Sequence, residues 1–320
     1  MRAIEIIGAG PAGAAAALTV LNEGGAVRVS EKSRLPRHKV CGEFLSPEIA
    51  PLLDSIGVLQ DFAAAEPARI RRLLLRFRSR EKRCALPEAA YGLSRYCFDE
   101  LLARRALACS VDEACELGAR IVAHGRRAAA PRGRRLFGFK AHYEGPYDDA
   151  IELYFFNQCY IGINTVENGI TNVCGLGPEH ILRERNFDID ELAAGCDALR
   201  ARLAPLRRTM DWLMTGPLVF ETHFASEVSA YMAGDALSFV DPFTGSGILS
   251  AVLTGTLAGT AAMRNTPMQD YIRECRERLR RPFLISGVFR KAIANGWGEY
   301  LAPFVPGSWL VRMTRPLTTS

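Results

Sequence analysis

The sequence lacks the clustered cysteines and histidines that hold structural zinc or a disulfide framework. Its nine cysteines are spread singly along 320 residues, with no C-x-x-C pair. Structural zinc sites need several such ligands at short spacings, and disulfide-stabilised secreted domains are shorter and richer in cysteine. We therefore predict a reduced, cytoplasmic protein without a metal site.

A strong excess of one charge is also missing. Forty basic residues against 35 acidic ones leave a net charge of +5, and the basic residues gather in short clusters such as 132–135 and 276–281. Such clusters are usually solvated faces, and no nucleic-acid-binding signature accompanies them. The composition therefore predicts no nucleic-acid partner.

Long apolar runs are few, and neither of the two present is typical of an export or membrane segment. Glu5 interrupts the apolar run that follows Arg2, which makes it a poor secretory leader. Residues 242–263 carry no charge over 22 positions, enough to cross a bilayer, but glycine, serine and threonine dilute them. We expect a buried helix beside a cofactor there. With 48% hydrophobic residues and no internal repeat, the chain suits one large or two interleaved domains.

The most informative residues that are present are the glycines near the start. Gly8-x-Gly10-x-x-Gly13 falls where an apolar strand, residues 3–7, would turn into an alanine-rich helix. In a dinucleotide-binding βαβ unit these glycines permit a tight turn, a close approach to the pyrophosphate and close helix–strand packing. The helix N-terminus would face the phosphates. Glu31, 18 residues after Gly13, is near the spacing expected for a carboxylate that binds the ribose.

A second glycine-rich turn lies toward the other end of the chain. Gly234-Asp235-Ala236 follows an expected strand and precedes Gly245-Ser-Gly247 at the start of the charge-free helix. A helix N-terminus offers unpaired N–H groups and partial positive charge, and glycines would let a flat ring approach it. Such a site suits the pyrimidine edge of a flavin, with Asp235 accepting hydrogen bonds from the ribityl chain. A glycine-rich turn made only for packing explains the same residues.

The middle of the chain predicts an antiparallel sheet. Aromatic and β-branched runs separated by turn residues extend over 136–176, and residues 73–77 form a further strand. Residues 188–214 follow a helical pattern, and residues 220–233 return to strand. The basic, aromatic tail from residue 266 onward is expected to be helical.

Taken in order, these motifs resemble the flavoprotein monooxygenase superfamily. They are the G-x-G-x-x-G turn with its acid, the R-Y-C-F-D sequence that begins at Arg95, and the G-D-A and D-P-x-x-G-x-G sequences after residue 233. The stretches KVCGEFLSPE and GDALSFVDPFTGSGI look most like the geranylgeranyl reductase-like branch and its neighbours, the flavin halogenases and polyketide-tailoring oxidoreductases. Aromatic hydroxylases carry G-D-A-A-H, where this chain has Leu237 and Ser238. The resemblance covers most of residues 1–265.

This resemblance implies an α/β fold with interleaved domains. A Rossmann-type FAD-binding domain of the glutathione reductase-like kind would alternate along the chain with an antiparallel-sheet substrate domain, followed by a helical C-terminal tail. The implied boundaries are residues 1–65, 90–135 and 225–265 for the first domain, 66–89 and 136–224 for the second, and 266–320 for the tail.

The resemblance also implies which residues contact FAD. The first glycine turn would face the pyrophosphate, Glu31 the ribose, Asp235 the ribityl chain, and the second glycine turn the pyrimidine edge of the ring. The whole implied set is Gly8, Gly10, Pro11, Ala12, Gly13, Glu31, Lys32, Lys39, Cys41, Gly42, Arg95, Asp235, Pro242, Gly245, Gly247 and Ile248. No catalytic residue follows from the motifs. Cys41 is either a small side chain in a tight loop or a redox thiol, and His38 is either a solvent-facing histidine or a proton donor.

One departure from the family pattern concerns the adenine side of the cofactor. Family members have a β-meander after the helix that begins at the Arg95 position, whereas residues 109–123 lead almost directly to His124-Gly125-Arg126. Roughly 30 to 40 residues are missing, judged from three strands of ~5 to 6 residues plus their turns. The wall beside the adenine would therefore be shortened.

A second departure concerns the substrate side. Geranylgeranyl reductases have a Tyr-x-Trp-x-Phe-Pro strand over the flavin, and the matching stretch here is Tyr160-Ile-Gly-Ile-Asn164. The W-x-W-x-I-P stretch of flavin halogenases is absent too. Neither prenyl reduction nor halogenation can be carried over.

These observations predict an FAD-dependent oxidoreductase that acts on an apolar, isoprenoid- or polyketide-like small molecule, by hydroxylation or by reduction of a carbon–carbon double bond. No second G-x-G-x-x-G is present, so NAD(P)H would dock transiently or a reduced-flavin or electron-transfer partner would supply electrons. The alternative is a truncated flavoprotein that binds FAD weakly and serves as a ligand-binding or inactive protein. Residues 266–320 are either packed against the domains or a peripheral membrane contact.

Overall fold

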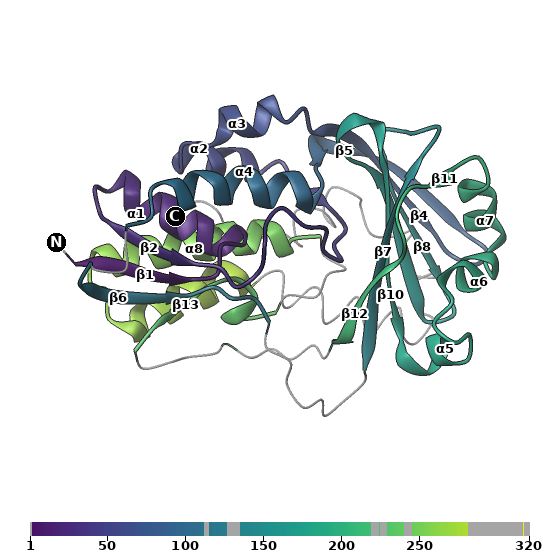
Figure 1. The fold of residues 1–320 in the computed structure, drawn as a ribbon. Coiled ribbons are helices and arrows are strands. Elements are labelled where there is room, and N and C mark those ends of the chain that lie inside the picture. Colours follow the sequence, from purple (N-terminus) through teal and green to yellow (C-terminus); the bar gives the residue numbers. More distant parts are fainter. Residues whose placement is uncertain are drawn as a thin grey trace.

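The chain folds into two sheets that lie side by side (Figure 1). The computed structural model describes residues 2–111, 115–126, 135–218, 224, 229–239, 245–280 and 316. The smaller sheet is parallel and carries helices on its faces, while the larger sheet is almost entirely antiparallel. The predicted α/β fold, with a Rossmann-type half and an antiparallel-sheet half, is thereby confirmed.

The parallel sheet has four strands in the order β13-β6-β1-β2. They are β1 (Ala3–Ile7), β2 (Val27–Ser30), β6 (Leu117–Val122) and β13 (Tyr231–Met232). Helix α1 (Pro11–Asn22) connects β1 to β2 and completes the expected βαβ unit. Of the strand predicted at residues 220–233, residue 224 and residues 229–233 are described, and β13 lies in the latter stretch.

Two helices cross in close contact on this sheet, α1 and α8 (Gly247–Met263). A Cβ atom on Gly255 would lie 2.1 Å from the carbonyl oxygen of Ala12, and one on Gly259 would lie 2.8 Å from that of Ala16. Only glycine allows backbones to approach so closely. Helix α8 lies within the charge-free segment predicted to be buried, and none of the described helices is both long and apolar enough to span a bilayer.

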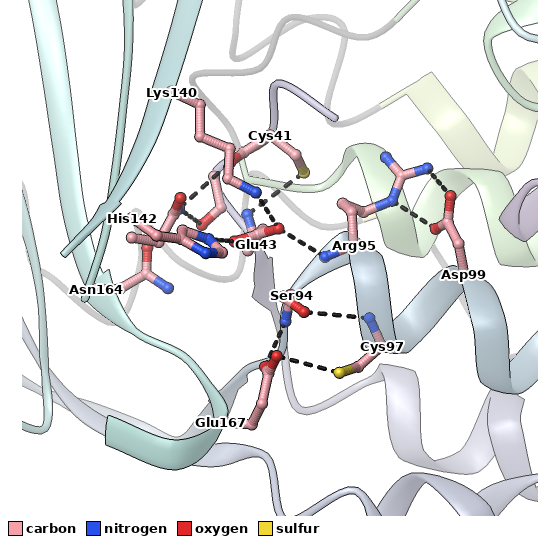
Figure 2. A network of polar contacts seen from close by, with 12 residues as sticks. Cys41, Glu43, Ser94, Arg95, Cys97, Asp99, Lys140, His142, Asn164 and Glu167 are labelled. Atoms are coloured by element: carbon pink, nitrogen blue, oxygen red, sulfur yellow. Dashed lines mark hydrogen bonds and ion pairs between the residues drawn. The ribbon is translucent and has the colours of Figure 1, made fainter. Parts of the chain in front are cut away.

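Three more helices cover the parallel half. They are α2 (Ile49–Ser55), α3 (Leu59–Ala64) and α4 (Arg95–Ala108). Ser94 caps α4, because its hydroxyl accepts a hydrogen bond from the amide of Cys97 at 3.1 Å. The cap fixes the start of the helix at Arg95, which places that residue at the edge facing the large sheet (Figure 2).

The outer edge of the parallel sheet is short, as the sequence predicts. After α4, only Ser110 and Val111 pair with β2, through a parallel bridge to Val27 and a 2.8 Å hydrogen bond from the amide of Val111 to the carbonyl of Val27. Strand β6 begins six residues after Val111, at Leu117. In the part of the chain that is described, no meander stands between α4 and β6.

The large sheet has nine strands in the order β11-β7-β10-β9-β8-β4-β5-β3, with β12 paired to β7. Every pairing is antiparallel except that of β4 with β8. The strands are β3 (Phe44–Leu45), β4 (Ala68–Arg76), β5 (Glu81–Gly92), β7 (Leu136–Glu144), β8 (Ala150–Phe156), β9 (Cys159–Thr165), β10 (Thr171–Pro178), β11 (Arg207–Arg208) and β12 (Leu213–Leu218).

Three short helices cover the face of the large sheet that points away from the parallel half (Figure 1). They are α5 (Glu179–Arg183), α6 (Ile189–Ala194) and α7 (Asp197–Leu203). The helical prediction for residues 188–214 is wrong beyond Leu203, because Pro205 cannot continue a helix and the chain then forms β11 and β12. The opposite face of the sheet is left for the site described below.

The C-terminal region is described only in its first part. Residues 268–280 are helical, and the hydroxyl of Tyr271 donates a 2.6 Å hydrogen bond to the carbonyl of Met232 on β13. Residues 281–315 and 317–320, which carry the predicted membrane contact, lie outside the described residues. All nine cysteines are free thiols.

We expect Gly255→Ala to lower the free energy of unfolding by about 1–3 kcal/mol or more, because the added methyl group would overlap the backbone of α1. Urea unfolding measures the effect. Gly247→Ala, in the same helix but with no heavy atom within 4 Å of the added Cβ, is the matched control and should change stability little. Equal unfolding midpoints for the two variants would contradict the close crossing.

Candidate functional site

The first glycine turn presents the N-terminus of α1 to open space. Gly8 has a φ of 105°, which favours glycine, and a Cβ on Gly13 would lie 1.8 Å from the carbonyl oxygen of Gly8. No side chain caps the helix at Gly10. The nearest atom to a Cβ placed on Gly10 is Nζ of Lys39, at 3.9 Å. An uncapped helix N-terminus beside a lysine forms a cradle for an anion such as phosphate.

Glu31 lies at the end of β2 and is tied to this turn. Its carboxylate accepts hydrogen bonds from the amides of Ala9 at 2.9 Å and Ser33 at 2.8 Å. The neighbouring Lys32 is exposed. These bonds hold the carboxylate beside the glycine turn, where the sequence predicts the ribose.

Asp99 organises two cations next to the same turn. Its side chain is fully buried and accepts hydrogen bonds from Arg95 at 2.6 and 2.8 Å and from Lys39 at 2.6 Å. Burial alone would raise the pKa of Asp99, but the charges of Arg95 and Lys39 outweigh it and hold the pKa below the usual 3.8. The carboxylate therefore fixes both cations toward the site.

Asp235 faces the same cations from the other side. Its side chain is accessible to solvent, yet the surrounding protein desolvates it and raises the pKa of its carboxyl group. Arg95, Arg126 and Lys39 act in the opposite direction, so all three lie near it. Arg126 follows β6 and was not predicted from the sequence.

Within the described residues, which leave out 240–244 just before it, the N-terminus of α8 has no side-chain cap. Gly245 has a φ of 61°, and a Cβ on Gly247 would meet no heavy atom within 4 Å. Ile248 is buried in the core beneath this helix start. The predicted Pro242 lies outside the described residues. A flat group could therefore approach the amides at this helix start.

A buried carboxylate, Glu43, joins the loop after Lys39 to both halves of the protein (Figure 2). It accepts hydrogen bonds from the amide of Arg95 at 2.6 Å, from Nε2 of His142 at 2.7 Å and from the ammonium of Lys140. Burial would raise the pKa of Glu43, but the hydrogen bond from His142 and the charge of Lys140 outweigh it, so the pKa is lowered. Glu43 is thus ionised.

The loop carrying Cys41 and Gly42 is fastened to the large sheet as well. The side-chain amide of Asn172 donates to the carbonyl of Gly42 at 2.9 Å and to that of Cys41 at 3.3 Å. This leaves Cys41 beside Cys174, a thiol whose pKa burial raises. A redox role for Cys41 and a proton-donor role for His38 both remain predictions.

The face of the large sheet that points toward the parallel half is polar in its middle. Register places His142, Asn172 and Asn164 in one row across β7, β10 and β9. The next row holds Lys140, Cys174 and Gly162. Sequence reasoning missed these residues, although polar residues at even positions alternate with buried apolar ones in β7 and β9, a pattern typical of a two-sided sheet.

One group of residues near these rows, His38, Glu43 and His142, has the composition of a metal site but is poorly suited to hold a metal ion. Atoms of His38, Glu43 and His142 lie within 4.8 Å of one another. Lys140 and the Arg95 amide already bond the carboxylate, and a divalent cation would face the buried ammonium at close range. The described side chains thus favour a hydrogen-bonded cluster.

Comparison with solved structures identifies the fold. A triple mutant of the flavin-dependent brominase Bmp2 matches with a TM-score of 0.82 and 16% identity, over 98% of this chain and 94% of that one. A flavoprotein/dehydrogenase from Cytophaga hutchinsonii matches with a TM-score of 0.76 and 18% identity, over 98% and 90%. A geranylgeranyl bacteriochlorophyll reductase-like protein from Thermoplasma acidophilum matches with 0.71 and 18%, over 99% and 92%. No family model and no curated protein matches the sequence. The fold predicted by the resemblance is confirmed.

We expect Asp99→Asn to lower the free energy of unfolding by about 3–5 kcal/mol, because it leaves Lys39 and Arg95 without their buried counter-ion. Asp197→Asn is the control, since Asp197 forms an exposed pair with Arg200 and should matter little. The folded-state pKa of Asp99 is depressed, so its stabilisation is present above pH 3.8 and is lost as pH falls through the lowered value. Urea unfolding between neutral and acidic pH should therefore show a shallower loss for Asp99→Asn than for the wild type.

Proposed function

We propose that this protein is a flavin-dependent oxidoreductase that binds FAD between its two sheets. The observation that carries the proposal is the pair of uncapped helix N-termini, α1 and α8, with open glycine positions at Gly10 and Gly247. Lys39 and Arg95, held by Asp99, would bind the pyrophosphate between them. The named activities of the structural neighbours, bromination and a flavoprotein dehydrogenase, agree with this class.

When bound, the flavin would supply the redox chemistry, and the protein would bind, orient and exclude water. The amides at the start of α8 would hydrogen-bond the electron-rich edge of the ring, where negative charge gathers on reduction. Asp235 would accept hydrogen bonds from the ribityl hydroxyls. Next to the polar rows of the large sheet, Leu136, Leu176 and Leu218 form a small apolar cluster that would hold the apolar part of a substrate.

The substrate we propose is an apolar small molecule, isoprenoid- or polyketide-like, that is hydroxylated or reduced at a carbon–carbon double bond. Gly162 and Asn164 stand where the reductase strand has large aromatic residues, and this difference favours neither reaction. Stopped-flow reoxidation separates the two. A long-lived oxygen adduct of the flavin would indicate oxygenation, and fast reoxidation without one would indicate reduction. NAD(P)H or a reduced-flavin partner would supply the electrons, and we propose a cytoplasmic location.

A second candidate function is ligand binding without catalysis. The observation that favours it is the short outer edge of the parallel sheet, where Ser110 and Val111 are the only described residues that pair with β2 on that side. The adenine half of FAD would have fewer contacts there and would bind more weakly. Protein that stays colourless after purification and after incubation with FAD would favour this candidate and contradict the first.

We expect the purified protein to take up FAD, and Lys39→Met to weaken binding about tenfold or more, because a hydrogen bond to a charged group contributes roughly 1.5–3 kcal/mol. Fluorescence titration with FAD measures both affinities. Lys82→Met, on β5 of the large sheet, is the control for loss of a lysine and should bind FAD as the wild type does. Equal affinities for the wild type and both variants would place the phosphates elsewhere.

A further inference from the structure

The polar rows of the large sheet contain two charged or titratable groups that packing does not require. Lys140 is fully buried, and the side chain of His142 is 8% exposed. Both lie on β7, two residues apart, and so point to the same face, toward the parallel half. Burying such groups is costly unless they are paired. Glu43 bonds both side chains, which offsets the cost of burying them but does not explain their presence.

The hydrogen bonds settle which nitrogen of His142 carries a hydrogen. An ionised carboxylate can only accept, and Glu43 accepts from Nε2 at 2.7 Å. Nε2 therefore carries the hydrogen, and Nδ1 is the position at which a proton is gained or lost. Within the described residues, nothing hydrogen-bonds to Nδ1. Glu43 thus holds an imidazole with its basic nitrogen unused.

The neighbouring Lys140 places a positive charge on the same carboxylate that holds His142. Its ammonium is fully buried, so it would act on a bound group through its charge. A group that loses a proton to His142 would leave a negative charge, which this ammonium would stabilise. The apolar cluster of Leu136 and Leu176 continues the same face of the sheet, so the group would sit at the polar end of an apolar molecule.

The short loop between Lys39 and Glu43 ties this pair to the proposed flavin site. Lys39 lies over the glycine turn at one end, and Glu43 bonds His142 at the other. Four peptide units span at most about 14 Å. The same short segment therefore contacts both the glycine turn and the histidine pair.

We propose that His142 is the proton-accepting residue of this site, and that the substrate carries a phenolic or enolic hydroxyl. The inference rests on the proposed flavin function and names its substrate class. The O–H bond of the hydroxyl breaks, an N–H bond forms at Nδ1, and the electron pair stays on the oxygen and spreads into the ring. The imidazolium is stabilised by Glu43 and the oxyanion by Lys140. No oxidation or reduction occurs in this step, and it leaves an electron-rich carbon for the flavin reaction.

His38 provides the route to solvent. Its ring lies 5.1 Å from that of His142, edge to face, and it is exposed. Burial, followed by the charges of Lys140 and His142, lowers its pKa, while Glu43 and Glu167 act in the opposite direction. A neutral His38 can accept the proton from His142 and release it to water.

The test uses 4-nitrophenol as the probe, with the purified protein as it is obtained after incubation with FAD. Difference spectra against protein without probe report whether the bound phenol is ionised, over a range of pH. We expect the wild type to bind the yellow phenolate at pH values where the free probe is protonated. His142→Gln, whose amide can still donate to Glu43, should weaken phenolate binding roughly 10- to 100-fold. His180→Gln, an exposed histidine on α5, is the matched control and should behave as the wild type.

A second measurement needs no variant. In wild-type protein labelled with ¹⁵N in its five histidines, probe binding should convert one imidazole to an imidazolium. Three results would each overturn the proposal. They are equal ionisation of the phenol by the wild type and His142→Gln, absence of the imidazolium signal, and failure of the phenol to bind. FAD uptake is recorded in the same samples, so a protein that ionises the phenol through His142 but takes up no FAD would support this site and contradict the flavin function.

Discussion

One buried carboxylate, that of Glu43, holds together the parts of the protein from which the site is made. It joins the loop that follows Lys39, the first amide of α4 and strand β7 of the large sheet. Its backbone has a φ of 51°, in the left-handed region that costs a residue with a side chain about 1 kcal/mol or more. Three hydrogen bonds to an ionised, buried carboxylate offset this cost. Asn172, which bonds the carbonyls of Cys41 and Gly42, and the pair of Lys39 with Asp99 fasten the same loop at its other residues.

The cations around the proposed phosphate position are also held in place by a buried carboxylate, that of Asp99. Lys39 and Arg95 are held by Asp99 rather than by the ligand, so their positions do not depend on what is bound. Asp235 lies near the same cations, whose charges oppose the desolvation that raises its pKa. Ligand binding would therefore meet charges that are already oriented, with little conformational entropy left to lose.

Short sequence motifs predicted those parts of the site whose geometry depends on residues close together in the sequence. The glycine turn, the start of α4 at Arg95 and the open start of α8 each follow from a short motif whose geometry is set within a few residues. His142 and Lys140 could not be found in this way, because their meeting with Glu43 spans about a hundred residues and depends on strand register. Alternation along β7 indicated a two-sided strand, but not what its polar face contacts. The wrong helix beyond Leu203 has a local cause that was overlooked, Pro205.

The glycine contact between α1 and α8 also fixes a length. Gly255 meets α1 at Ala12, almost at the tip of that helix, whereas the tip of α8 lies eight residues earlier, at Gly247. At 1.5 Å per residue, the start of α8 lies about 12 Å along its own axis from the point of contact, and the close contact does not allow the helices to slide. In the proposed function, one molecule would reach both helix starts only if its two electron-rich ends were at least about that far apart. A free phosphate or a small carboxylate would be too short to do so.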